Sequence, residues 1–142
     1  MSIWVVVRWV IMLTAAAGEL FAPLHPLAHP PIGWVALLAI FGGCSVGMVL
    51  VLGLQAANPF SAKQWLRPSW RSNPLNFRQP MQFFHLGAYV CLAQGLVLLL
   101  RLVFSHVPFY LEALVPMVMA LGILVGLELV SLLFRAKVES RA

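Results

Sequence analysis

The sequence predicts an all-α integral membrane protein, a bundle of four transmembrane helices with both termini in the cytoplasm. Of its 142 residues, 62% are hydrophobic and only 9% are charged, whereas an average soluble domain has about 25% charged residues. The apolar residues also fall into four long runs, each of which can cross a hydrocarbon core of about 30 Å. Residues 1–142 are therefore expected to form a single transmembrane domain.

The first two predicted spans cover residues of about 3–20 and 34–57, and a loop rich in Pro and His, residues 21–33, joins them on the outer side. The third and fourth spans are expected at about 83–104 and 109–134. Because Pro108 separates them, they should form a tight hairpin, and Pro116 interrupts the fourth span.

The first span could also be a cleavable signal peptide, because a run of three Ala, residues 15–17, resembles a small-residue cleavage site. No Lys or Arg precedes the apolar run, which favours its retention as a helix. Processing would leave three spans and place the termini on opposite sides.

The positions of the cations predict the orientation of the chain. Its net charge is +5, and Lys and Arg are concentrated in the loop of residues 58–80 and in the tail after residue 134, while the first and third connections have none. The positive-inside rule places this loop and both termini in the cytoplasm, in what we expect to be a bacterial inner membrane. The same location excludes a nucleic-acid partner and indicates contact with anionic lipid headgroups.

The loop of residues 58–80 contains an internal repeat, since Asn58-Pro59 is followed fifteen positions later by Asn73-Pro74. Asn caps a helix and Pro is tolerated in its first turn, so each pair is expected to open a short helical turn. Aromatic and Arg side chains alternate here, which favours an amphipathic segment in the headgroup layer or, alternatively, a docking surface for a partner protein. The expected lipid- or partner-docking residues are Trp65, Arg67, Trp70, Arg71, Phe77 and Arg78.

Ionisable side chains inside the spans are the best functional clues, because each is costly in hydrocarbon unless it is paired or hydrated. Matching depths predict that Arg101 pairs with Glu19 or Glu112 near the outer end, and that Arg8 lies at the depth of Glu128 near the inner end. Three Glu against two Arg leave one carboxyl group without a counter-ion, and that group could carry a proton. The favoured alternative is that the paired charges only fix the helix register and the remaining Glu reaches water at the outer rim. The expected intramembrane ionic or proton-carrying residues are Arg8, Glu19, Gln94, Arg101, Glu112 and Glu128.

Histidines at the outer face, His25, His29 and His106, could in principle form a metal site. Pro residues surround the first two and prevent the helix that would bring them together, so we expect polar loop histidines and no metal or other cofactor. His85 is expected in the interfacial belt beside neighbouring aromatic residues.

Glycines four residues apart, which let helix backbones approach closely, occur as Gly43 with Gly47 and as Gly122 with Gly126. We expect these pairs to pack helices within the chain, and the alternative for the first pair is a contact with another subunit.

The sequence contains no nucleotide-binding loop, nucleophile elbow or metalloprotease motif, so no enzymatic activity is predicted. The leading hypothesis is a small non-catalytic membrane subunit or accessory assembly factor that docks on a larger membrane complex. The alternative is an oligomeric transporter coupled to protons or cations through an intramembrane Glu. A third hypothesis is metal or haem binding at the outer face.

Overall fold

The computed structural model describes residues 2–24, 32–58, 60, 67–106 and 110–134. The elements are four α-helices and one short 3-10 helix: α1 (Ile3–Phe21), α2 (Trp34–Ala57), α3 (Pro80–Phe104), η1 (Leu111–Leu114) and α4 (Val115–Leu133). The described residues include no strand. The predicted all-helical chain is confirmed, with four helical segments that are long and apolar enough to span a membrane.

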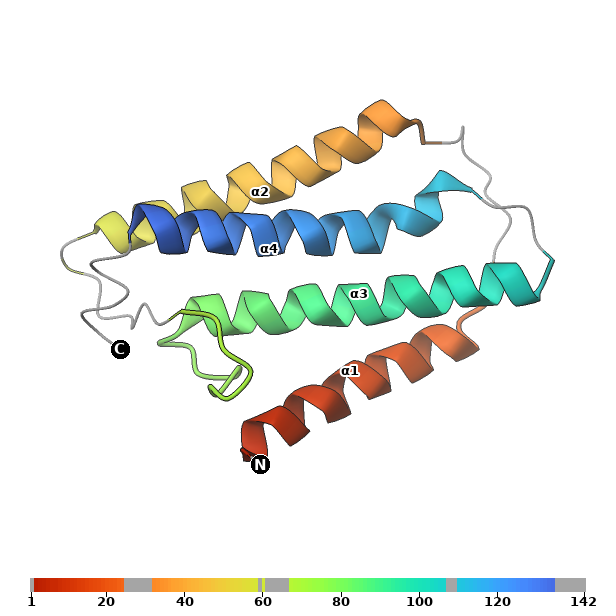
Figure 1. Ribbon diagram of the computed structural model, residues 1–142, viewed down its shortest axis with the longest axis horizontal. Coiled ribbons are helices and arrows are strands. Elements are labelled where there is room, and N and C mark those ends of the chain that lie inside the picture. Colours follow the sequence, from red (N-terminus) through yellow and green to blue (C-terminus); the bar gives the residue numbers. More distant parts are fainter. Residues whose placement is uncertain (1, 25–31, 59, 61–66, 107–109, 135–142) are drawn as a thin grey trace.

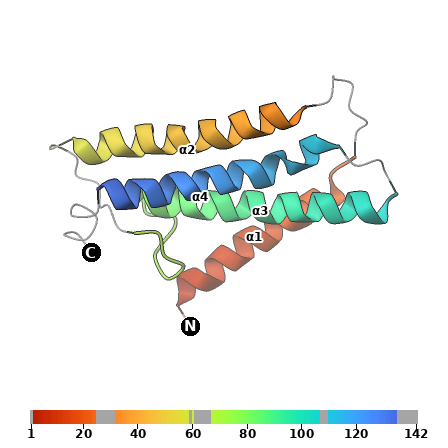
Figure 2. The same cartoon turned by 45° about the horizontal axis from the view of Figure 1, so that its top comes forward.

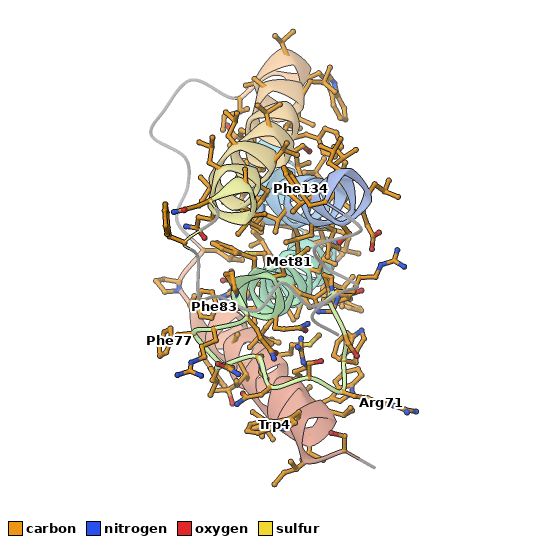
Figure 3. All side chains as sticks on the ribbon, turned by 90° about the vertical axis from the view of Figure 1, so that its left-hand side faces the viewer. Trp4, Arg71, Phe77, Met81, Phe83 and Phe134 are labelled. Carbon is orange, nitrogen blue, oxygen red and sulfur yellow. The ribbon has the colours of Figure 1, made fainter. Side chains whose placement is uncertain are left out.

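The four helices stand in one row (Figure 1): α2 packs on α4, α4 on α3, and α3 on α1. In Figure 2, α2 and α1 lie on opposite sides of the central pair, α4 and α3. The end-on view in Figure 3 shows the same row of helices as a vertical column. The helices therefore form an open layer, whereas the sequence predicted a bundle. In this layer α1 and α2 are the outer members.

Glycines allow a close contact between α2 and α4. A Cβ atom on Gly122 would lie 2.7 Å from the carbonyl oxygen of Phe41, and one on Gly126 would lie 2.5 Å from the Cβ of Met48. The hydroxyl of Ser45 also donates a hydrogen bond of 3.0 Å across this contact, to the carbonyl of Gly122. The two helices are thus too close for any side chain at either glycine.

The other predicted glycine pair has a different environment. A Cβ atom on Gly43 or Gly47 would meet nothing within 4 Å. The packing within the chain that the sequence predicted for this pair is therefore not found among the described residues. The pair lies on a face of α2 that remains open.

Proline explains where two of the predicted spans begin. α3 starts at Pro80 rather than near Phe83, because Pro lacks an N–H and is well tolerated in the first helical turn. Pro116 stands in the first turn of α4, so the segment before it forms η1 instead of regular helix. Figure 1 shows the start of α1, residues 67–79 and the end of α4 at the same end of the layer, which we call the loop end.

The described residues of the loop form turns. The side-chain oxygen of Asn73 accepts a hydrogen bond of 2.9 Å from the N–H of Leu75, and Asn58 and Asn76 make the same bond two residues ahead. These are Asx turns, in which the side chain replaces a backbone acceptor. Asn73-Pro74 opens a turn at residues 74–75, as the sequence predicted, but residues 67–79 contain no helix.

Candidate functional site

Arg8 is completely buried at the loop end, where α1, α3 and residues 67–79 meet. Its Nη1 donates to Nδ1 of His85 at 3.1 Å, and its Nη2 donates to the carbonyl of Ser72 at 3.2 Å and to Oε1 of Gln82 at 3.3 Å. The guanidinium carbon lies 5.8 Å from the ring centroid of Trp70, within range of a cation–π interaction. Among the described residues, this charge is surrounded by neutral acceptors and has no carboxylate within 4.0 Å.

Gln82, also completely buried, fixes the backbone of the loop. Its Nε2 donates to the carbonyl of Arg67 at 2.6 Å, and its Oε1 accepts the N–H of Ser69 at 3.0 Å. Irregular backbone at membrane depth is tolerated only where its polar groups find partners inside the protein. Arg8 and Gln82 supply such partners, which explains why two strongly polar side chains are buried here.

Trp70 fills the space between α1 and α3, which diverge toward the loop end (Figure 1). Its ring centroid lies 6.1 Å from that of Trp9 in a stacked arrangement and 4.6 Å from that of Tyr89 in an edge arrangement. Tyr89 follows Pro80 by nine residues, about 14 Å along the helix axis. Trp70 therefore packs between α1 and α3, and its expected position in the headgroup layer stays a prediction.

The hydrogen bond between Arg8 and His85 fixes the proton state of the imidazole. A guanidinium group can only donate, so Nδ1 of His85 must accept and the neutral ring carries its proton on Nε2. His85 is 8% exposed, and its predicted depth in the interfacial belt stays a prediction. Its protonation would place two cations side by side and remove this acceptor.

Sequence reasoning identified Arg8 but missed the residues that hold it. Gln82, His85 and Tyr89 recur at intervals of three and four residues and so share one face of α3. This polar face was the available signal, because an intramembrane Arg requires acceptors on a neighbouring helix.

The rest of the loop points outward. Phe77 is 89% exposed, and Arg71 and Arg78 are exposed too. Figure 3 shows Phe77 and Phe83 on one side of the layer and Arg71 pointing away on the other side. We call Phe77 and Phe83 the aromatic edge. The sixth predicted docking residue, Trp65, lies outside the described residues.

The predicted ion pair of Arg101 with Glu19 or Glu112 is not found among the described residues. Nη1 of Arg101 donates to the backbone carbonyl of Glu19 at 2.5 Å, and no carboxylate lies within 4.0 Å of Arg101 in the described ranges. Glu128 instead forms an exposed ion pair of 3.2 Å with Arg67 of the loop. Arg8 cannot meet Glu128 because α3 separates α1 from α4.

Glu112 is the acidic residue with the most unusual environment. Its Oε1 accepts the N–H of Ile32 at 2.6 Å, just before α2 begins. Its Oε2 is buried and has no hydrogen-bond partner in the described structure. A buried polar atom without a partner is costly, so this oxygen marks Glu112 as a candidate for a role beyond packing.

The remaining predicted site residues do not assemble into a site. Gln94 is partly buried in the middle of α3, and His106 is exposed just after it. His25 and His29 lie outside the described residues. In the ranges that the structure describes, no three His, Cys, Asp or Glu side chains come together as metal ligands.

The candidate site is thus the cluster of Arg8, Trp70, Gln82, His85 and Tyr89 together with the outward side of the loop that it fixes. Arg8 and Gln82 are completely buried, and their hydrogen bonds hold the loop backbone against α1 and α3. No protein-family model, curated protein or solved structure matches the chain.

Proposed function

We propose that this chain is a small non-catalytic integral membrane subunit, or accessory factor, that docks on a larger membrane complex through the aromatic edge. The ordered loop supports this proposal: Arg8 and Gln82 hold its backbone while Phe77 stands 89% exposed. Large aromatic side chains dominate the energetics of protein interfaces. A loop that is already fixed loses little conformational entropy when a partner binds.

The open layer of helices agrees with such a role. Many large apolar side chains of the outer helices are exposed, among them Leu13 and Leu20 of α1 and Val35 and Leu54 of α2, so these helices leave apolar surface for lipid or other helices. A single row encloses no path of its own, which disfavours a transporter working as one copy. Gly43 and Gly47 would also let another helix approach α2 closely.

The proposal includes a location. We infer a bacterial inner membrane with the loop end in the cytoplasm, supported by the cations of residues 58–80 and by the placement of this loop beside the start of α1. Labelling of Arg71 or Arg78 positions from the outside of intact cells would contradict this orientation.

A photo-crosslinking amino acid in place of Phe77 tests the docking role directly. We expect a discrete crosslinked species containing a second membrane protein, because the ring projects from a fixed backbone. The matched control is Phe21, which is 84% exposed at the opposite end of the layer and should crosslink to lipid alone. Lipid adducts alone at position 77 would contradict the proposal.

Phe77→Ala measures the energetic contribution of the same side chain. Because truncation of an interface hot spot costs about 2 kcal/mol or more, the partner identified by crosslinking should bind at least about tenfold more weakly. Phe21→Ala should leave that affinity unchanged. Equal binding by both variants would remove the aromatic edge from the interface.

Proton- or cation-coupled transport by an oligomer is a second candidate, favoured by the buried Oε2 of Glu112. We expect Glu112→Gln to abolish proton flux in liposomes if this function exists, since the amide cannot release a proton. Glu19→Gln is the control, because Glu19, unlike Glu112, has no carboxylate oxygen that is buried without a hydrogen-bond partner. Absence of flux with the native chain would exclude this candidate.

A further inference from the structure

A hollow of about 470 Å³ opens between the C-terminal ends of α1 and α3, at the end of the layer opposite the loop end. We call it the Arg101 groove. Four of its six lining residues come from one face of α3, a fifth is the residue that caps this helix, and the sixth belongs to α1. The six are Val97, Leu100, Arg101 and Phe104, then Ser105, and Leu20. The groove therefore runs along α3 and is bounded by the last turn of α1.

The lining of the Arg101 groove changes from apolar to polar toward the C-terminal end of α3. Arg101 and Ser105 lie at the end of α3, where a spanning helix would reach the headgroup region. Val97 lies eight residues before Ser105, about 12 Å deeper along the axis. The groove thus combines a cationic mouth with an apolar wall.

The guanidinium of Arg101 retains capacity to bind an anion. It carries five N–H donors, and its one hydrogen bond to a described residue is the bond of 2.5 Å from Nη1 to the carbonyl of Glu19. That bond orients the group, and no described carboxylate lies within 4.0 Å to neutralise it. The hydroxyl of Ser105 borders the same space.

We propose that the Arg101 groove binds a phospholipid. The phosphate lies on the guanidinium of Arg101 and the hydroxyl of Ser105, and an acyl chain covers Val97 and Leu100. A planar guanidinium matches the geometry of phosphate oxygens, and the charge of the site is complementary to this anion. Inorganic phosphate would leave the apolar wall uncovered, so the wall selects for the lipid. This site is independent of the aromatic edge and of the proposed docking role.

Native mass spectrometry of the full chain in mild detergent tests the proposal. The probes are phosphatidylglycerol, phosphatidylcholine and diacylglycerol with identical acyl chains, together with inorganic phosphate. We expect both phospholipids to bind, and diacylglycerol and inorganic phosphate to bind at least about tenfold more weakly, a difference of about 1.4 kcal/mol. If diacylglycerol binds with the same affinity as the phospholipids, the assignment of the phosphate to Arg101 and Ser105 is wrong. If inorganic phosphate binds with the same affinity as the phospholipids, the assignment of a lipid to the groove is wrong.

Variants locate the binding in the groove. Arg101→Gln should weaken phospholipid binding about tenfold, whereas Arg71→Gln, an exposed cation at the loop end, should leave binding unchanged. Equal binding by Arg101→Gln and the native chain would overturn the proposal. Because Arg101 also orients the end of α1, a variant that leaves it in place is needed as well.

Val97→Trp fills the groove and keeps Arg101 intact. Its matched control is Val103→Trp, on the same helix at a position that is 69% exposed and outside the groove. With native helicity and monodisperse elution in both, we expect Val97→Trp to lose bound phospholipid and Val103→Trp to retain it. Retention of the lipid by Val97→Trp would place the binding elsewhere and overturn the assignment.

Discussion

Arg8→Ala should lower the free energy of unfolding by about 2–5 kcal/mol, because it leaves several buried acceptors without donors, each at a cost of about 1–3 kcal/mol. The acceptors are Nδ1 of His85 and the carbonyl of Ser72, and Gln82 would lose one of its partners. Removing the cation also removes its own desolvation cost. The cost of the unpaired acceptors is larger than this gain, because the polar groups of the loop stay buried after the substitution.

Denaturation of the purified chain in detergent, followed by Trp fluorescence, measures this effect, since Trp9 and Trp70 stack beside the substituted position. We also expect faster tryptic cleavage at Arg71 as the loop leaves the layer. The control is Arg67→Ala, which breaks an ion pair whose side chains are 65 and 59% exposed, and such a pair contributes about 1 kcal/mol at most. Equal losses in the two variants would contradict the structural role of Arg8.

Gly126→Leu should separate α2 from α4 and cost about 3 kcal/mol or more, because overpacking alone typically costs about 1–3 kcal/mol and here the helix backbones must move. A Cβ atom at this position would lie 2.5 Å from the Cβ of Met48 and 2.8 Å from the carbonyl oxygen of Ser45. The second contact is with backbone, so a change of side-chain rotamer cannot relieve it. Denaturation by titrated sodium dodecyl sulfate, followed by circular dichroism, measures the loss.

Gly47→Leu is the matched control for that substitution. The same change on α2 meets no atom within 4 Å, and replacing a helical Gly gains about 0.8–1.0 kcal/mol of helix propensity at most. We therefore expect unchanged or slightly higher stability of the isolated chain. Destabilisation equal to that of Gly126→Leu would mean that glycine content, rather than the α2–α4 contact, determines the effect.

Hydropathy and length were enough to predict the helices, because lipid imposes the same length requirement on every span. The predicted second span, residues 34–57, coincides with α2. Pro80 and Pro116 both stand in the first turn of a helix, where the missing N–H of proline is tolerated. The sequence predicted an interruption at Pro116 because the same residue inside a helix would disrupt it.

The pairing of charges could not be predicted from depth, because depth along a helix does not say which helices are neighbours. Arg8 and Glu128 have similar depths, but α3 stands between their helices. The Asn-Pro repeat was ambiguous for a related reason, since the same Asn oxygen can cap a helix or close an Asx turn. Likewise, the composition of the loop does not say whether Trp70 faces lipid or protein.

The position of α1 at the edge of the layer has a consequence for synthesis of the chain. The groups that receive the Arg8 hydrogen bonds lie 64 to 77 residues downstream, beyond the whole of α2. While the ribosome is still making α2, the cation has none of these partners. The acceptors of the Arg8 guanidinium thus become available only when the start of α3 has been made. Burial of this cation therefore depends on two helices that are distant in the chain, while α2 contacts the layer through α4.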